Sequence, residues 1–275
     1  MTAPEPRRGA FTLSDGLALS YLRWGRPQDP ELVLLHGGGL SATDWQEIAP
    51  ELAAAGYHVT APDLRGCGES DWDPEVRYGV EQILADAGEL FDHLRLEQFV
   101  LVGHSLGAVA ACVYAARNPQ RVRACVLEDG GPADHTRPAS LESPTIVFDS
   151  DAHALAALGK MLPRGVPGWV LETRFERLED GRLTWRSDIA GRVRWSAAGG
   201  EPLIPALWPY VEAIRSPTLV VRGGESTLFR VEYAERMTAL NANIGLVTIP
   251  GAGHLVHCER PVEFTSAVLG FLAGP

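Results

Sequence analysis

The chain has 275 residues, enough to bury a substantial core, and we expect one domain with an insertion. Its residues are 45% hydrophobic and 21% charged, which is ordinary for a soluble globular protein, and no run of about 18 apolar residues indicates a membrane span. The formal net charge of −11 repels phosphate backbones and anionic membranes, so we expect neither nucleic-acid nor membrane binding.

The amino terminus and the cysteines bear on the cellular compartment. No apolar run follows Arg7 and Arg8, so we do not expect residues 1–11 to be a signal peptide. The cysteines have neither CxxC spacing nor a histidine at metal-ligand distance; they are Cys67, Cys112, Cys125 and Cys258. This pattern favours free thiols in a reducing compartment, and we expect a cytoplasmic protein without a metal.

Apolar runs bounded by turn residues recur along the chain. Residues 10–24 alternate around Asp15-Gly16, which predicts an antiparallel hairpin at a sheet edge. The later predicted strands are 32–35, 57–61, 99–102, 124–127, 218–221 and 245–249. Helical patterns between them cover 45–55, 80–94 and 106–117. Strands that alternate with helices in this way predict a mostly parallel sheet covered on both faces.

This alternation breaks between residues 132 and 216, a segment with weaker periodicity and several prolines. We predict that it is a mostly helical insertion, the cap, over the carboxyl ends of the strands, and that residues 1–131 and 217–275 form the core. The cap contains four tryptophans: Trp169, Trp185, Trp195 and Trp208. Some of them are expected to line an apolar site, and others to pack between cap and core.

The strongest chemical signal is the motif Gly103-His-Ser105-Leu-Gly107, which lies between a predicted strand and a predicted helix. A serine at such a sharp turn is held in a strained backbone conformation that projects its hydroxyl above the sheet. The flanking glycines are needed because the strand and helix backbones pass too close for side chains. The helix amino terminus also favours developing negative charge. We therefore predict that Ser105 is a nucleophile.

A second motif, His36-Gly-Gly38-Gly, directly follows the predicted strand 32–35. Acyl transfer needs hydrogen-bond donors aimed at the oxygen that becomes negative in the tetrahedral intermediate. The natural donors are the backbone N–H groups of Gly38 and of Leu106, the residue after the nucleophile, which would form an oxyanion hole. A plain glycine turn is the alternative. We expect His36 to brace this loop rather than to act in catalysis.

The third motif, Pro250-Gly-Ala-Gly-His254, follows the last predicted strand. A serine hydroxyl is a poor nucleophile until a neighbouring imidazole accepts its proton. A histidine on this glycine-rich loop can reach Ser105 in space, so we predict that His254 is the general base. His257 is a weaker alternative because it lies away from the loop apex.

Together these motifs resemble the α/β-hydrolase superfamily, on the residues His36-Gly37-Gly38, Asp63-Leu-Arg-Gly-Cys-Gly-Glu-Ser70, Gly103-His-Ser-Leu-Gly107 and Gly251-Ala-Gly-His254. The likeness spans about Phe11 to Leu272 and is weakest in the cap. It implies an α/β fold with a doubly wound, mostly parallel eight-stranded sheet, no cofactor, and a serine–histidine–acid triad. The chain resembles the esterases and carbon–carbon hydrolases of the group. Aspartate-nucleophile dehalogenases and epoxide hydrolases are disfavoured, because Ser105 stands where they carry an aspartate.

The triad acid departs from the family pattern. Relatives place an aspartate after the strand that is here 218–221, in a pattern such as Arg-Gly-x-x-Ser-Asp, but Thr227 stands at that position. A threonine can neither fix the histidine tautomer by charge nor stabilise the imidazolium. Some members carry the acid one strand earlier, at the position of Asp129. We predict that Asp129 orients His254.

Alternatives to this acid remain open. Glu225 lies two residues before Thr227, and Glu128 directly precedes Asp129. A reaction without any triad acid is a further possibility. Asp129 would then be a structural carboxylate that caps the turn before Pro132.

The leading functional expectation is a serine hydrolase that cleaves an ester, thioester, lactone or activated carbon–carbon bond of a small, fairly apolar molecule, through an acyl-enzyme on Ser105. The altered acid motivates a second hypothesis, a lyase, cyclase or cofactor-free oxygenase, because a base without a strong triad partner suits proton abstraction. A small-molecule receptor on the same fold is the third. Ser105→Ala separates the first two, because only the first requires the hydroxyl.

Overall fold

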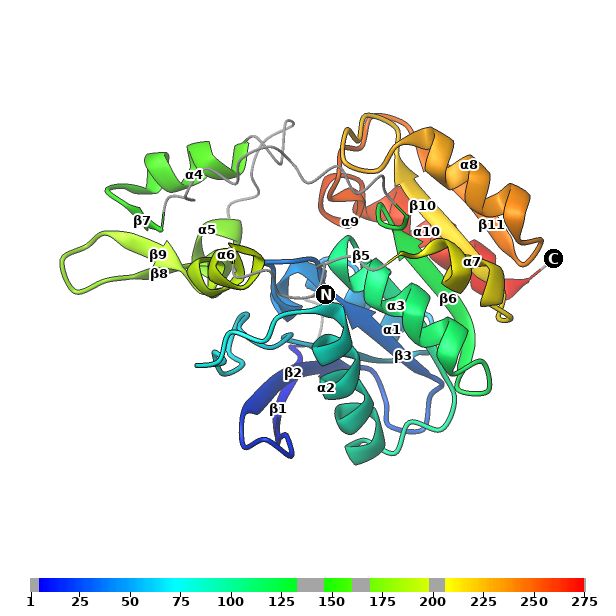
Figure 1. The fold of residues 1–275 in the computed structure, drawn as a ribbon, viewed down its shortest axis with the longest axis horizontal. Coiled ribbons are helices and arrows are strands. Elements are labelled where there is room, and N and C mark those ends of the chain that lie inside the picture. Colours follow the sequence, from blue (N-terminus) through cyan, green and yellow to red (C-terminus); the bar gives the residue numbers. More distant parts are fainter. Residues whose placement is uncertain (1–4, 133–145, 160–168, 198–205, 275) are drawn as a thin grey trace.

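The computed structural model describes residues 5–132, 146–159, 169–197 and 206–274, and Figure 1 shows their arrangement around one large sheet. Its strands are β1 (Arg7–Thr12), β2 (Ala18–Trp24), β3 (Glu31–Leu35), β4 (His58–Pro62), β5 (Phe99–His104), β6 (Val122–Glu128), β10 (Thr218–Gly223) and β11 (Ile244–Ile249). They lie in the order β1-β2-β4-β3-β5-β6-β10-β11. The hairpin β1–β2 and the pair β2–β4 are antiparallel, and the other neighbouring pairs are parallel. The expected eight-stranded, mostly parallel sheet and its edge hairpin are confirmed.

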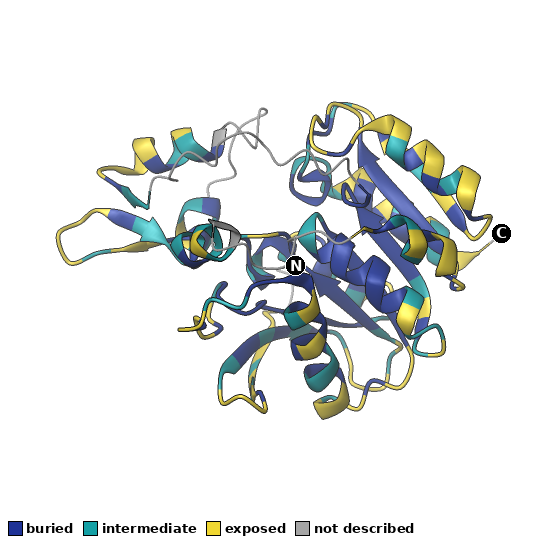
Figure 2. Ribbon diagram, viewed as in Figure 1, coloured by how far each residue is buried: buried dark blue, intermediate teal, exposed yellow. Residues whose placement is uncertain are grey.

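The central strands are buried along their length because helices cover both faces of the sheet. Every residue of β4 and of β5 is buried, as expected for strands with no solvent-facing side. One apolar cluster joins the sheet to α2 (Val80–His93), α3 (Leu106–Arg117) and α8 (Val231–Leu240). A second cluster joins the opposite face to α1 (Ala49–Ala54) and α10 (Pro261–Ala273). Figure 2 shows the central strands and α3 as the buried middle of the molecule.

The predicted helix over residues 45–55 is divided in the structure. A 3₁₀ helix, η1 (Ala42–Trp45), comes first, and α1 then begins at Ala49 with Pro50 in its first turn. The division follows from Pro50, which has no N–H to donate and whose ring would clash with the carbonyl four residues earlier in a continuous helix. A single helix over this range was therefore a wrong prediction.

The described part of the cap contains helices and a small sheet. The helices are α4 (Asp151–Gly159), α5 (Trp169–Arg174) and α6 (Ile189–Ala197). The sheet is antiparallel, with β9 (Leu183–Trp185) between β7 (Val147–Phe148) and β8 (Phe175–Arg177). Its residues Phe148, Phe175, Leu183 and Trp185 belong to a separate apolar cluster. We predicted helices here but not this sheet, because strands of two or three residues leave no periodic signal.

The chain returns to the core earlier than residue 217. Helix α7 (Trp208–Ala213) packs on α3, and the buried side chains of Leu207, Val211 and Ile214 belong to the core cluster beside α2 and α3. The predicted boundary fell later because α7 precedes the next strand by only a few residues and has too few turns to show a helical period.

Candidate active site

The predicted nucleophile lies at the turn between β5 and α3. Ser105 has φ 52° and ψ −113°, a backbone region that residues with a Cβ rarely adopt. Its backbone N–H donates to the carbonyl oxygen of Glu128 at 2.9 Å, which ties the turn to β6. A strained serine is thus held at the carboxyl end of the sheet, the geometry that the motif predicted.

The two glycines of this motif are required by close backbone packing. A Cβ on Gly103 would lie 2.2 Å from the carbonyl oxygen of Gly107. A Cβ on Gly107 would lie 2.2 Å from the carbonyl oxygen of Leu35, at the end of β3. Both distances are far inside van der Waals contact, so the strand, the turn and the helix can meet only where these residues have no side chain.

The glycine loop after β3 lies against this turn. A Cβ on Gly37 would be 3.2 Å from the Cβ of Ser105, and a Cβ on Gly38 would be 3.5 Å from the Cδ2 of Leu106. Gly38 is exposed, whereas His36 and Gly37 before it are buried. The two residues predicted to donate to an oxyanion, Gly38 and Leu106, are therefore neighbours at an open position beside Ser105.

His36 braces this loop. Its Nδ1–H donates to the carbonyl oxygen of Gly37 at 2.7 Å, and its Nε2 accepts the backbone N–H of Leu64 at 2.9 Å. Burial lowers the pKa of His36 to about 4, so the imidazole is neutral at physiological pH. A neutral ring with one donor and one acceptor satisfies both bonds, in agreement with the expected bracing role.

The predicted base and acid are in contact. The Nδ1–H of His254 donates to Oδ2 of Asp129 at 2.6 Å, and the Asp129 side chain is completely buried. The other carboxylate oxygen of Asp129 accepts the backbone N–H of Gly223 at 3.0 Å. Because Nδ1 carries the proton in this arrangement, the Nε2 lone pair of His254 is left to accept one.

The two alternative acids occupy other environments. Glu128 is buried, and both of its carboxylate oxygens lie 2.8 Å from Nδ1 of His257. Glu225 is exposed on the loop after β10, as is Thr227. The structure therefore brings Asp129 to His254, the predicted base. Glu128 contacts His257 instead, the weaker alternative for the base.

Two polar residues at this site were not singled out from the sequence. Ser226 donates its hydroxyl to Oδ2 of Asp129 at 2.5 Å. His104 donates its Nε2–H to the backbone carbonyl of His254 at 3.0 Å. Burial, followed by the neighbouring histidines His254 and His257, lowers the pKa of His104 well below its ordinary value, so this ring is neutral. The only sequence signal was their position, because His104 precedes the nucleophile and Ser226 precedes the expected acid position.

The cap touches the glycine loop directly. The Ser187 hydroxyl donates to the carbonyl oxygen of Gly39 at 3.1 Å. The Cδ1 of Ile189 lies 3.0 Å from the position of a Cβ on Gly39. Nearby, Arg174 of α5 forms a buried ion pair with Asp44 of η1, its Nε donating to Oδ1 at 3.0 Å. The start of α6 is thus fixed to the loop that carries Gly38, and the end of α5 is fixed to η1, which follows that loop.

Three of the four tryptophans assigned to the cap from the sequence make packing contacts in the structure. Trp185 stacks on Phe175 inside the cap, with ring centroids 4.4 Å apart, and Trp208 packs under Arg236 of α8. Trp169 donates its Nε1–H to Glu47 at 2.7 Å and so joins the cap to the core. For these three residues, packing between elements describes the contacts of the side chain.

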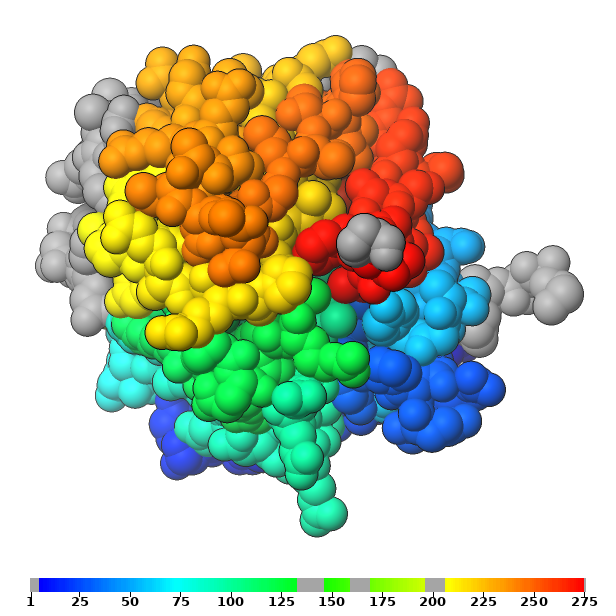
Figure 3. Space-filling view, turned by 90° about the vertical axis from the view of Figure 1, so that its right-hand side faces the viewer, coloured from blue at the N-terminus to red at the C-terminus, as the bar shows by residue number. Residues whose placement is uncertain are grey.

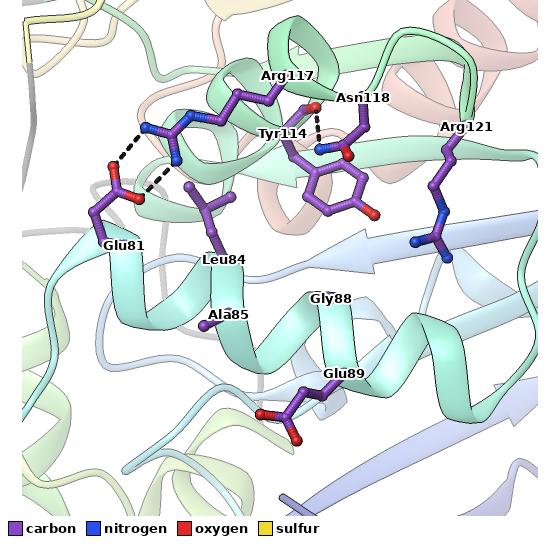
Figure 4. Close-up of a pocket in the computed structure, with 9 residues that line it drawn as sticks. All are labelled: Glu81, Leu84, Ala85, Gly88, Glu89, Tyr114, Arg117, Asn118 and Arg121. Carbon is purple, nitrogen blue, oxygen red and sulfur yellow. Dashed lines mark hydrogen bonds and ion pairs between the residues drawn. The ribbon is translucent and has the colours of Figure 1, made fainter. Parts of the chain in front are cut away.

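Two cavities in the described part of the chain lie away from Ser105. One of them, of about 410 Å³, lies between α2 and α3 beside the ion pair of Arg117 and Glu81. Figure 4 shows the residues that line it. Arg117 ends α3, whereas Ser105 precedes its start, about 18 Å away along the helix axis. The other cavity, of about 650 Å³, lies at the amino ends of β3, β5 and β6, beside the end of α10. Figure 3 views the molecule from the side on which the end of α10 lies.

Comparison with known proteins agrees with this geometry. A family model described as alpha/beta hydrolase fold matches residues 30–147. The sn-1-specific diacylglycerol lipase of Mus musculus is 31% identical, across 94% of this chain and 86% of the lipase. The 3-hydroxybutyrate-oligomer hydrolase of Cupriavidus necator is 30% identical, across 90% of this chain and 91% of that protein. The crystal structure of an alpha/beta hydrolase from Novosphingobium aromaticivorans has a TM-score of 0.82 and 28% identity, with 98% of each chain covered.

Proposed function

The chain belongs to the α/β-hydrolase fold family and is a hydrolase, and we propose that Ser105, His254 and Asp129 form its catalytic triad. The single observation that carries this proposal is the 2.6 Å hydrogen bond from His254 to the buried Asp129. It supplies the carboxylate that the usual position, occupied by Thr227, lacks. The strained backbone of Ser105 supports the assignment of the nucleophile.

The proposed reaction is acyl transfer to Ser105 followed by hydrolysis. The Ser105 Oγ attacks the substrate carbonyl while its proton passes to Nε2 of His254, and Asp129 stabilises the imidazolium. The N–H groups of Gly38 and Leu106 donate to the tetrahedral oxygen. His254 then protonates the leaving group as the bond to it breaks. A water molecule then attacks the acyl-enzyme while His254 accepts its proton. His254 returns this proton to the Ser105 Oγ as the acid product leaves.

The substrate we propose is a small, fairly apolar molecule with an ester, thioester, lactone or activated carbon–carbon bond. Among these, a carboxylic ester has the most support. The names of two similar proteins give a diacylglycerol and 3-hydroxybutyrate oligomers as what they act on, and ester bonds occur in both kinds of molecule. The net charge of −11 favours neutral over strongly anionic substrates.

The same net negative charge repels phosphate backbones, so we propose that the protein has no nucleic-acid partner. No helix in the described part of the chain is long and apolar enough to cross a membrane. We propose a cytoplasmic location on the basis of the four cysteines, which are all free and buried.

The test is hydrolysis of a panel of short-chain esters and thioesters, with rapid quenching to trap the covalent intermediate. We expect turnover of at least one ester and a mass increase of one acyl group on the peptide that contains Ser105. Ser105→Ala should abolish both. Turnover that survives in Ser105→Ala would favour the lyase, cyclase or oxygenase hypothesis, against which the Asp129–His254 contact already weighs.

A further inference from the structure

Two consecutive acidic residues at the end of β6 bind two histidines that are three residues apart. Asp129 accepts from His254, as described above. Glu128 accepts from His257, both from its Nδ1, at 2.8 Å to each carboxylate oxygen, and from its backbone N–H at 2.9 Å. The proposed triad uses the first pair and leaves the second without a role. The second pair also fixes the start of α9 (Val256–Glu259) to the end of β6.

The second pair is a buried ion pair. The side chains of Glu128 and His257 are 0% and 1% exposed. Burial alone would lower the pKa of His257, but the neighbouring Cys258 and the Glu128 carboxylate outweigh it and raise this pKa well above its ordinary value. The Glu128 carboxylate in contact with Nδ1 favours the imidazolium form of His257. Removal of either partner leaves a charge in an apolar surrounding, where the neutral form is favoured instead.

His104 connects this ion pair to the general base. Its ring lies between the other two, with centroids 5.1 Å from the ring of His257 and 4.7 Å from the ring of His254. The same His104 ring donates to the backbone carbonyl of His254. His257 also packs on Trp45 of η1, with ring centroids 4.2 Å apart. His257 thus contacts the ring of His104, and His104 holds the backbone of His254.

We propose that the Glu128–His257 ion pair positions the general base, by fixing the start of α9 and the His104 ring so that His254 keeps its hydrogen bond to Asp129. This inference rests on the proposed catalytic role of His254. Glu128 and His257 contact each other and α9 rather than the reacting atoms. They are positioning residues.

Single neutral substitutions of the pair should act on geometry rather than on charge near the base. Glu128→Gln removes the carboxylate, and the buried His257 then loses its proton, so both charges disappear together. His257→Gln removes the imidazolium and leaves Glu128 with the backbone N–H of residue 257 and the new amide as donors. Each variant therefore abolishes the ion pair and leaves hydrogen-bond donors beside residue 128. In the double variant Glu128→Gln/His257→Gln the two amides can hydrogen-bond to each other, so it should recover part of the loss.

The experiment measures the rate at which a fluorophosphonate labels Ser105, together with the low-field proton NMR signal of Nδ1–H in His254, assigned by its absence in His254→Ala. We expect each single variant to lose about tenfold to a hundredfold in labelling rate, since small misplacements of catalytic groups cost that much. On an ester substrate, kcat should fall with little change in KM. The His254 signal should broaden or disappear. Asp86→Asn is the matched control.

Asp86 also belongs to a buried ion pair, in which Arg65 donates to its two oxygens at 2.7 Å each, but it lies on α2, away from the proposed triad. Its substitution should lower stability without changing the labelling rate or the His254 signal. If both single variants label Ser105 at the wild-type rate and keep that signal, the positioning role is wrong while the proposed function stands. If the wild type itself is not labelled, the proposed function fails first.

Discussion

Replacement of Asp129 by asparagine tests the acid assignment with little change in shape. In Asp129→Asn, the retained oxygen can still accept the backbone N–H of Gly223, so the new NH₂ group takes the place of Oδ2. One of its hydrogens then points to Nδ1 of His254, which must become the acceptor. The other points to the hydroxyl oxygen of Ser226, which can accept instead of donating. The ring proton of His254 therefore moves to Nε2. A protonated Nε2 can no longer accept the hydroxyl proton of Ser105.

This wrong tautomer should lower kcat by about 10⁴-fold, equivalent to about 5 kcal/mol in the activation free energy. The assay is steady-state ester hydrolysis, with circular dichroism to verify that the variant is folded. Glu225→Gln is the matched control, because Glu225 is an exposed carboxylate on the nearby loop and its substitution should leave kcat unchanged. A folded Asp129→Asn protein that retains kcat within threefold of wild type would refute the role of Asp129. If kcat falls in Glu225→Gln and not in Asp129→Asn, Glu225 rather than Asp129 is the triad acid.

Three further predictions concern the surroundings of the site. Ser226→Ala removes a hydrogen bond to the Asp129 carboxylate, worth roughly 1.5–3 kcal/mol, so kcat should fall at least several-fold with KM unchanged; an unchanged kcat would contradict this support. Burial lowers the pKa of His36 to about 4, so between pH 6.5 and 4 the unfolded chain binds a proton that the folded chain does not. The unfolding free energy of the wild type, measured by urea titration, should therefore fall relative to that of His36→Gln by about 3 kcal/mol as the pH falls from 7 to 4. A difference between the two proteins that does not change with pH would contradict the lowered pKa of His36. Arg174→Met leaves Asp44 buried and unpaired, so urea unfolding should show a loss of about 3–5 kcal/mol; a loss below 1 kcal/mol would mean that the pair is not intact in solution.

The features that the sequence could predict are local ones. The glycine spacing around Ser105 reports a backbone crossing that excludes any Cβ, and the two 2.2 Å approaches of the structure are the direct cause of that spacing. Apolar runs predicted the central strands because a strand covered on both faces has few polar positions. Asp129 was accessible only through the family resemblance, because some members carry the acid at the end of the strand that follows the nucleophile helix; in the structure that strand, β6, lies beside β5 and ends at the same edge of the sheet.

The features that the sequence could not predict depend on contacts between distant segments. The pairing of Glu128 with His257 requires the start of α9 to meet the end of β6, and neither segment carries a pattern that fixes this register. The hydroxyl of Ser226 reaches Asp129 across 97 residues of sequence separation. The small cap sheet is held by aromatic packing between Phe148, Phe175 and Trp185 rather than by a repeat within any one strand.

The activation of Ser105 can be tested directly without knowledge of the substrate. The purified protein is treated with a fluorophosphonate, and the adduct is located by peptide mass spectrometry. We predict rapid, stoichiometric labelling at Ser105 that is lost in His254→Ala and strongly slowed in Asp129→Asn. No labelling of the folded wild-type protein, or labelling that is equally fast without His254, would contradict the proposed triad.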